Sequence, residues 1–432
     1  MSVVDPDSIV DQARVGSAFG PLSLAFACPG WPPENYANGI ITLVSLFTEQ
    51  MRRHGHEVFV LADRGSSAPG EDVRVIDGLR RSAHPAGRLV DILARRASAH
   101  LGERIQVVRA YRTMARRLIV ERGLQLLEME ESFGYAREVQ RALEIPVVVR
   151  LHGPWFLNGM DVPADKSYRH RVRAEGLAIR DAFAVSSPSL DVLNKTRQFY
   201  GLDLPNARVI HNSVEAVPEH LRWTPAGADP DEILFVGRFD RHKGGDVVID
   251  AFAEVARRHP TARLRFVGPD RGVVDDSGRR WSIEEYASDR LGPIGALGRW
   301  TWMGQQPAVA LQGLRRKAGV VVVGSRYDNF PTTVLEAMAI GCPLVAARAG
   351  GIPEMVDDGV DGLLFESGRP EDLAARLGRL LDDRCLAARL GHGASVESDR
   401  RFSLDVMTHD SEMFYREAIA DFRRRRAGSN SR

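Results

Sequence analysis

The chain alternates short, continuously apolar runs with longer segments in which apolar residues recur every three or four positions. Runs rich in valine, isoleucine and leucine, such as residues 147–151 and 319–323, are typical of strands in a parallel sheet that is covered on both faces. The longer segments, such as residues 40–54, have the spacing of an amphipathic helix. Strands that alternate with helices in this way predict an α/β protein built on parallel sheets.

The predicted elements follow one another along most of the chain. Predicted strands cover residues 22–27, 57–61, 124–129, 147–151, 182–185, 208–210, 232–236, 264–267, 319–323 and 343–346. Predicted helices cover residues 40–54, 166–180, 331–340, 370–381 and 407–425, and residues 80–122 have a helical pattern throughout.

The length of 432 residues, with 44% apolar content, favours two domains of about 200 residues each. Residues 216–231 are proline-rich and irregular, so we predict the linker there. The predicted division is a polar N-terminal tail (1–20), a first domain (21–215), the linker (216–231), a second domain (232–405), and a C-terminal helix with a basic tail (406–432). Residues 271–300 read as a polar insertion in the second domain.

Charge and cysteine content narrow the functional classes. The formal net charge of +1 gives no reason to expect a nucleic-acid partner. Cys28, Cys342 and Cys385 are widely spaced and odd in number, which indicates neither a disulfide framework nor a metal site and fits a reducing cytoplasm. The acidic N-terminus does not resemble a secretory signal, and no apolar run of about 18 residues predicts a membrane span. We therefore expect a cytoplasmic protein without a metal ion or a cofactor.

Residues 321–354 combine a buried strand with a helix start and two carboxylates. Pro331 suits a first helical turn, and the free backbone N–H groups of Thr332 and Thr333 then form an anion site. Glu336 lies one turn further, about 6 Å along the helix axis, where it can accept hydrogen bonds from ribose hydroxyls. Asp328, in the loop before the helix, reaches the other side of the phosphates. The stretch therefore predicts a site for a nucleoside diphosphate, with a sugar beside Asp328.

The same stretch resembles the signature of the retaining nucleotide-sugar glycosyltransferases of family 4, the group 1 type. In that family an acidic residue is followed after seven residues by Glu and usually Ala-Met-Ala; here Asp328 precedes Glu336-Ala337-Met338-Ala339. The family mostly begins the segment with Glu-Gly, whereas this chain has Asp328-Asn329, followed by the Phe330-Pro331 that is common in the family. The resemblance implies the GT-B fold, in which two doubly wound Rossmann-like domains face a cleft and a C-terminal helix crosses back to the first domain.

The resemblance extends to the loop after the strand at 232–236. Gly237-Arg238 and, after a short gap, Lys243-Gly244 resemble the family's phosphate-binding loop. Arg238 offers a planar fork of donors and Lys243 a point charge, so both can converge on one diphosphate. Gly268 and Asp270, after the next strand, are expected to form a wall for the nucleotide base, which the backbone around Gly304 would read. A basic surface loop is the alternative for residues 237–245.

In the first domain three groups of residues are expected near the substrates, two of them from the resemblance. Asn38 and Gly39 occupy the position of a family loop that faces the donor sugar, although a simple structural turn is the alternative. His152 follows a strand and would face hydroxyls of the donor sugar; a structural histidine is the alternative. Glu130 and Tyr135 lie near another strand end, where open α/β sheets bind ligands, so we expect acceptor contacts there.

Residues 80–122 hold eleven arginines against Asp91, Glu103 and Glu121. Such a segment could dock on an anionic membrane surface, bind an acidic acceptor, or form an ordinary solvated face. These interpretations stay open at the level of sequence.

The resemblance implies a metal-independent retaining glycosyltransferase that moves a hexose from a nucleoside-diphosphate sugar to a hydroxyl. A UDP-sugar is favoured over GDP-mannose; the acceptor, such as a glycan, a lipid-linked sugar or a small natural product, is not identified, nor is an oligomeric state predicted. The expected catalytic residues are His152, Arg238, Lys243 and Asp328, with Asn329, Phe330, Pro331, Thr332, Thr333 and Glu336 around the donor.

Three alternatives remain. A non-hydrolysing sugar-nucleotide epimerase would share the fold, and a nucleotide-sugar-binding protein would lack transfer activity. A nicotinamide oxidoreductase would need a spaced-glycine fingerprint, which the loop at residues 28–40 lacks. The Asp-x-Asp of metal-dependent glycosyltransferases occurs at residues 5–7 and 229–231, but neither follows a predicted core strand, so we regard both as incidental.

Overall fold

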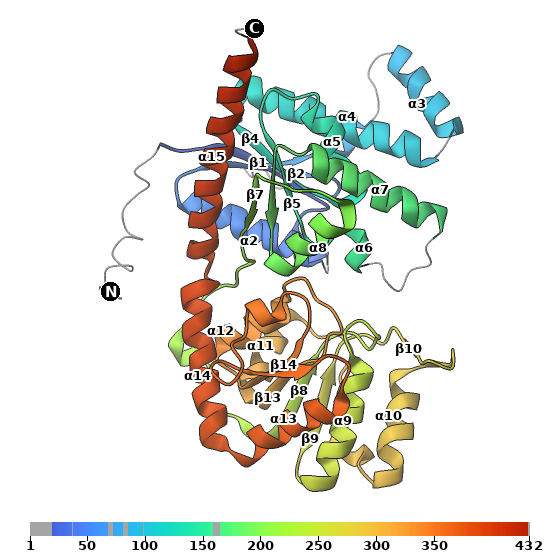
Figure 1. Ribbon diagram of the computed structural model, residues 1–432, viewed down its shortest axis with the longest axis vertical. Helices are drawn as coiled ribbons and strands as arrows, with labels where there is room; N and C mark the ends of the chain where they lie inside the picture. Colours follow the sequence, from blue (N-terminus) through green and yellow to red (C-terminus); the bar gives the residue numbers. More distant parts are fainter. Residues whose placement is uncertain are drawn as a thin grey trace. The chain divides into compact units, whose positions relative to one another are not determined.

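The computed structural model describes residues 20–36, 38–67, 72–80, 85–97, 99–158 and 165–430. The chain divides into two compact units, each with its own parallel sheet (Figure 1). Unit 1 comprises residues 1–188, 192–210 and 404–432, and unit 2 comprises residues 189–191 and 211–403. The predicted N-terminal tail lies outside the described residues, apart from Gly20. Two Rossmann-like parallel-sheet domains confirm the predicted fold class.

The sheet of unit 1 has seven parallel strands in the order β3-β2-β1-β4-β5-β6-β7. Its strands are β1 (Ser23–Cys28), β2 (Glu57–Ala62), β3 (Val73–Val75), β4 (Leu126–Glu130), β5 (Val147–Arg150), β6 (Ala184–Ser187) and β7 (Ala207–Val209). Its helices are α2 (Gly39–Arg53), α3 (Pro85–Ala97), α4 (Ala99–Arg122), α5 (Ala136–Gln140), α6 (Trp155–Asn158), α7 (Lys166–Asp181), α8 (Leu190–Tyr200) and α15 (Leu404–Asn430). The strand order reverses direction between β1 and β4, which makes their carboxyl ends a topological switch point.

The C-terminal helix α15 is part of unit 1, as the predicted fold requires. Tyr415 packs edge-on against Phe26 of β1, with ring centroids 6.1 Å apart. Its hydroxyl donates a 2.7 Å hydrogen bond to the buried carboxylate of Glu128 in β4. Apolar residues of α15 thus complete the core against one face of the sheet, next to α2 (Figure 1).

The sheet of unit 2 has six parallel strands in the order β12-β9-β8-β13-β14-β15. Its strands are β8 (Asp229–Val236), β9 (Arg263–Val267), β12 (Trp300–Trp302), β13 (Ala318–Val323), β14 (Leu344–Arg348) and β15 (Leu363–Glu366), and β10 (Val273–Val274) pairs with β11 (Arg280–Trp281) in a separate hairpin. Its helices are α9 (Gly245–Arg258), α10 (Ile283–Leu291), α11 (Ala308–Lys317), α12 (Thr332–Ile340), α13 (Pro370–Asp382) and α14 (Arg384–Arg401). Here the order reverses between β8 and β13.

Strand β13 shows why the apolar runs of this sequence form buried parallel strands. Val320 and Val322 belong to the core on one face of the sheet, whereas Val321 and Val323 belong to the core on the other face. Successive side chains of a strand point to opposite faces, so a strand covered on both sides needs apolar residues at every position. The continuous run that predicted this strand is thereby explained.

The structure differs from the sequence-based prediction at the start of β8 and in residues 271–300. Strand β8 begins at Asp229, inside the predicted linker, because Asp229 pairs with Ala318 of β13 beyond an irregularity in the register. Residues 271–300 are not a polar insertion: they form the β10–β11 hairpin and α10, and Trp281, Ile283 and Tyr286 join the core of unit 2. These few buried apolar residues are surrounded by polar ones in the sequence, so no regular pattern reveals them.

Across the described helices, none has the length and apolar composition that crossing a membrane requires.

Candidate functional site

Three glycines predicted at the donor site lie together at the carboxyl ends of β8, β9 and β12. The N–H of Gly237 donates to the carbonyl of Val267 (2.9 Å), and the N–H of Gly268 donates to the carbonyl of Gly304 (2.8 Å). Gly268 has a φ of 146°, and a Cβ there would lie 2.0 Å from the carbonyl oxygen of Gly237. Only glycine permits this approach. At these three strand ends the backbone segments therefore pack closely against one another, because glycines have no side chains to separate them.

Lys243 and Asp328 meet at the switch point of unit 2. The loop after β8 carries Lys243 and the loop after β13 carries Asp328, and the Lys243 Nζ lies 2.6 Å from the Asp328 Oδ2. The Ser325 hydroxyl donates to the same carboxylate oxygen at 3.2 Å. Gly244, with a φ of 69°, allows the two loops to touch, since a Cβ there would lie 1.9 Å from the carbonyl oxygen of Gly324. The structure thus brings together a cation and a carboxylate that are 85 positions apart in the sequence.

Arg238 lies in the same loop as Lys243. Its guanidinium Nε is 2.7 Å from the Asp240 carboxylate, and its side chain is 48% exposed. Asp240 also accepts a 2.7 Å hydrogen bond from the backbone N–H of Lys243. One carboxylate therefore fixes both the loop and the exposed guanidinium beside it.

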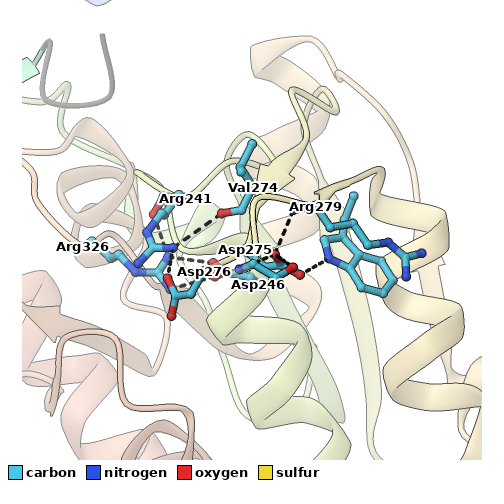
Figure 2. A network of polar contacts seen from close by, with 9 residues as sticks. Arg241, Asp246, Val274, Asp275, Asp276, Arg279 and Arg326 are labelled. Carbon is cyan, nitrogen blue, oxygen red and sulfur yellow. Dashed lines mark hydrogen bonds and ion pairs between the residues drawn. The ribbon is translucent and has the colours of Figure 1, made fainter. Parts of the chain in front are cut away.

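The loop is held in place by a polar network that the sequence did not indicate (Figure 2). Arg326, before Asp328, makes bidentate hydrogen bonds of 2.8 and 2.7 Å to Asp246 at the start of α9. It also donates to the carbonyl of Arg241 (2.7 Å), and Arg241 pairs with Asp276 of the β10–β11 hairpin at 3.0 Å. Asp246 is buried, so its pairing with Arg326 secures the two loops on either side of the switch point.

Helix α12 begins at Thr332, one residue after the predicted start, because Pro331 has an extended backbone and forms the N-cap without a side-chain cap. The N–H groups of Thr332 and Thr333 belong to the first turn, where no acceptor exists within the helix. They therefore remain suited to an anion. Phe330 is 4% exposed and stacks on His211, with centroids 4.9 Å apart, so its ring belongs to the core and fixes the approach to the helix.

Glu336 is ion-paired with Arg315 of α11. Arg315 is almost completely buried, whereas the side chain of Glu336 is 39% exposed. The sequence analysis missed Arg315, because in the run Arg315-Arg316-Lys317 at a helix end it looks like an ordinary surface cation. The buried Arg315 guanidinium donates to Oε2 of Glu336 and so fixes the orientation of this side chain, while part of the carboxylate stays exposed at the surface.

Asp270 has a structural role that the sequence did not suggest. Its Oδ1 accepts from the N–H of Gly272 (2.8 Å) and its Oδ2 accepts from the N–H of Ile283 (3.1 Å). The carboxylate thereby fixes the turn into the β10–β11 hairpin and the start of α10. A contact of Asp270 with the base stays a prediction, and it would have to use atoms beside these bonds.

In unit 1, Asn38 is the N-cap of α2: its Oδ1 accepts a 2.8 Å hydrogen bond from the N–H of Ile40. This bond accounts for asparagine at that position in structural terms. Gly39 begins the helix, and nothing lies within 4 Å of where its Cβ would be. The donor-facing role of both residues stays a prediction.

His152 and Glu131 lie at neighbouring strand ends of the unit 1 sheet. The Glu131 carboxylate accepts hydrogen bonds from the N–H groups of His152 (3.0 Å) and Gly153 (2.8 Å). Burial and the nearby carboxylate of Glu175 raise the pKa of Glu131 to about 8. Burial and the Arg150 guanidinium lower the pKa of His152 to about 3, so its imidazole is neutral near pH 7. Sequence reasoning missed Glu131, although Glu130-Glu131 follows a strand directly.

A cavity of about 530 Å³ is lined wholly by residues of unit 1. Both predicted acceptor-side residues, Glu130 and Tyr135, line it. Arg171 lies over the ring of Trp155 at 3.7 Å and over that of Phe133 at 4.3 Å. Burial raises the pKa of Glu130 to about 7. The other lining residues are Pro29, Asp63, Arg64, Glu103, Arg104, Tyr111, Asp165, Ser167, Tyr168, His170 and Ala174.

Within the described ranges, no group of three or more histidine, cysteine, aspartate or glutamate side chains is arranged to hold a metal ion. Cys28 and Cys342 are buried, and burial raises the pKa of each thiol to about 12. They are therefore packing residues.

Comparison with known proteins decides the family. The profile described as Glycosyl transferases group 1 matches residues 219–396, and the profile described as Glycosyltransferase Family 4 matches residues 37–216. The chain belongs to the family 4, group 1 glycosyltransferases. The resemblance stated from Asp328 and Glu336 is thus confirmed, and the two profiles meet near the beginning of the unit 2 sequence.

The curated relatives of this glycosyltransferase are named D-inositol 3-phosphate glycosyltransferases. The protein of Segniliparus rotundus is 35% identical over 197 residues, 45% of this chain and 42% of that protein. The protein of Saccharomonospora viridis is 34% identical over 248 residues, 57% of this chain and 52% of that protein. The chain thus matches about half of the length of these relatives, or less.

Solved structures show the same GT-B fold. The sucrose-phosphate synthase of Thermosynechococcus elongatus superposes with a TM-score of 0.68 at 20% identity, over 93% of this chain and 100% of that chain. HepE of Anabaena, in complex with UDP-glucose, superposes with a TM-score of 0.63 at 19% identity, over the same shares. At these identities the similarity concerns the fold alone.

Proposed function

We propose that this family 4 glycosyltransferase moves a hexose, with retention of anomeric configuration and without a metal ion, from a nucleoside-diphosphate sugar to an acceptor hydroxyl. One observation carries the proposal. At the switch point of unit 2, Lys243 and Asp328 lie 2.6 Å apart beside the first turn of α12, and Glu336 follows one turn later. This arrangement of two adjacent loops and helix α12 supports a phosphate site, with Asp328 as the carboxylate for the sugar and Glu336 as the carboxylate for the ribose.

The diphosphate would lie between the loop after β8 and the first turn of α12. Arg238, Lys243 and the N–H groups of Thr332 and Thr333 would neutralise the charge that develops when the bond between sugar and phosphate breaks. Fixed donors aimed at such charge contribute most in the transition state. A divalent ion would then be unnecessary, which is the basis for proposing a metal-independent reaction.

The sugar would lie beside Asp328, which would accept hydrogen bonds from its hydroxyls. Binding of the sugar would require Lys243 to shift part of its interaction from Asp328 to the phosphate, so the 2.6 Å pair represents the site before the donor enters. In unit 1, the neutral imidazole of His152 would orient a sugar hydroxyl. The acceptor hydroxyl would attack the face from which the diphosphate leaves, and the departing phosphate would take its proton.

The cavity of unit 1 supports a hydroxyl-rich acceptor. Its wall combines aromatic rings, on which the C–H face of a sugar ring can stack, with carboxyl groups such as Asp63 and Glu130, which can accept hydrogen bonds from hydroxyls. The complex of HepE with UDP-glucose supports a UDP-sugar as the first donor to test, and GDP-mannose remains the second.

A screen of nucleotide sugars by thermal shift tests the proposal. A donor at about 100 times its Kd should add about 2.7 kcal/mol to the free energy of unfolding. The best donor is then incubated with candidate acceptors, and the anomeric proton of the product is examined by NMR. Retained configuration is expected. An inverted product would contradict the proposed mechanism, and a new sugar nucleotide formed without any acceptor would indicate an epimerase.

A further inference from the structure

Helix α3 of unit 1 turns its apolar side outward. Leu89, Val90, Ile92 and Leu93 are 57%, 48%, 51% and 55% exposed, whereas the inward residue Ala94 is 7% exposed. At about 100° per residue these four aliphatic side chains occupy one continuous face of the helix. Surface helices of globular proteins bury such a face, so an exposed one marks an interaction site. Figure 1 shows α3 at the periphery of unit 1, against α4.

The orientation of α3 is fixed by a polar contact on its inner side. Asp91 is 8% exposed, and its two carboxylate oxygens accept hydrogen bonds of 2.9 and 2.7 Å from Arg109 of α4. Arg109 also donates to the carbonyl of Arg80 at 3.0 Å. A bidentate arginine–carboxylate pair has a defined geometry. Rotating α3 to bury its leucines would break this pair, so the outward apolar face is built into the fold.

The described charged side chains that α3 exposes are positive. Arg88 and Arg96 are exposed on α3 itself. On its other side, α4 borders a groove of about 550 Å³ that reaches Glu138 of α5, where Arg104 is ion-paired with Glu138; the remaining lining residues are Leu101, Ile105, Val108, Arg109, Arg112, Thr113 and Arg116. Leu101 is itself 44% exposed. Aliphatic side chains flanked by arginines are the composition of a helix that lies in the interface of an anionic bilayer.

We infer that the outward face of α3 docks this protein on an anionic phospholipid surface. The helix has 13 residues, which is too short to span a bilayer but long enough to lie in its interface. A second copy of the chain fits less well, because pairing two such faces would bring arginines of the same sign together. This inference does not depend on which sugar or acceptor the enzyme uses.

The test is cosedimentation of the full chain with vesicles. Wild-type protein should pellet with vesicles that contain phosphatidylglycerol and remain in the supernatant with pure phosphatidylcholine. The double variant Leu89→Ser/Leu93→Ser should reduce partitioning on the order of tenfold or more. Arg88→Gln/Arg96→Gln should weaken binding at low salt and reduce its salt dependence. The matched control Val309→Ser/Val360→Ser removes aliphatic side chains that are 82% and 59% exposed in unit 2, and it should bind like wild type.

Each alternative has its own result. Because the substituted leucines are exposed, the melting temperature of Leu89→Ser/Leu93→Ser should match that of wild type, so a loss of binding would not reflect unfolding. The inference is overturned if the wild-type protein does not pellet with anionic vesicles, or if the leucine variant binds them as strongly as wild type does. It is also overturned if light scattering shows a wild-type dimer that the leucine variant dissociates, since the face would then cover a second copy.

Discussion

Arg315 and Glu336 show how a single buried cation changes the account of a binding residue. The sequence predicts that the Glu336 carboxylate accepts hydrogen bonds from ribose hydroxyls. In the structure it is also the counter-ion of an almost completely buried guanidinium. Its orientation is therefore set before any nucleotide arrives, and its substitution must affect both binding and folding.

We expect Glu336→Gln to weaken binding of the nucleoside diphosphate about tenfold, because neutral hydrogen bonds replace charge-assisted ones. The melting temperature should also fall. Removing one member of a buried ion pair costs about 3–5 kcal/mol, and less is expected here because Glu336 is 39% exposed. Titration calorimetry and thermal unfolding measure the two effects. Glu371→Gln, at a largely exposed carboxylate of α13, is the matched control. Unchanged affinity in Glu336→Gln would remove this residue from the donor site.

Glu131 makes the stability of unit 1 depend on pH. Its pKa is about 8 in the folded protein, well above the ordinary value of 4.5, because the carboxyl group is buried near Glu175. The folded state therefore holds a proton that the unfolded state has lost, and the free energy of unfolding should fall as pH rises from about 4.5 to about 8. The limiting slope for one such group is about 1.4 kcal/mol per pH unit.

Glu131→Gln should flatten this slope, since the amide does not titrate but can still accept hydrogen bonds from the N–H groups of His152 and Gly153. Urea unfolding between pH 5 and pH 8, followed in wild type and variant, provides the comparison. Equal slopes in the two proteins would show that Glu131 is ionised in the folded state throughout this range.

At the scale of elements, the loops after β8 and β13 form one assembly, joined by Lys243 with Asp328 and by Arg326 with Asp246. Gly244 allows these loops to touch. In Gly244→Ala a Cβ would lie 1.9 Å from the carbonyl oxygen of Gly324, so the loops must separate. We expect donor affinity to fall at least about tenfold, because the cationic loop then loses its position beside α12.

Gly295→Ala separates this effect from simple backbone strain. Gly295 also has a positive φ, 64°, in the same unit, but its Cβ would have no neighbour within 4 Å. In Gly295→Ala the free energy of unfolding should fall by about 1–2 kcal/mol, because alanine is strained in the left-handed conformation, and the donor affinity should not change. Equal donor affinity in the two variants would mean that contact between the loops does not matter for binding.

The elements were also the level at which sequence reasoning was most informative. Continuous apolar runs such as that of β13 identify buried strands, because every side chain of such a strand enters one of two cores. The start of α12 was recognisable from Pro331 and the stop from Gly341, which has a φ of 79°. The prediction for residues 271–300 was wrong because the few buried apolar residues of this polar segment do not recur at a helical or strand spacing.

Ion pairs between residues that are far apart in the sequence could not be predicted. Nothing in the sequence connects Arg315 with Glu336, or Arg326 with Asp246, because these contacts depend on which strands become neighbours. Asn38 and Asp270 were predicted from the family pattern alone, and the structure shows that helix capping and turn formation explain them equally well. A sequence motif thus indicates position more reliably than role.

At the scale of the whole molecule, we propose that unit 2 binds the nucleotide sugar and that unit 1 binds the acceptor. The family and the GT-B fold follow from both profiles and from the solved structures. The specific proposal is that cationic side chains and a helix start take the part of a metal ion at the diphosphate. That proposal makes nucleotide binding independent of divalent cations.

Titration calorimetry with UDP and with GDP in excess EDTA tests this most directly. We predict that at least one of the two binds wild-type protein in EDTA, and that Lys243→Ala weakens this binding by tenfold or more, about the effect of one charge-assisted contact. Arg241→Ala, in the same loop but directed toward Asp276, should bind like wild type. Failure of both nucleotides to bind, or binding that appears only after magnesium or manganese is added, would contradict the account.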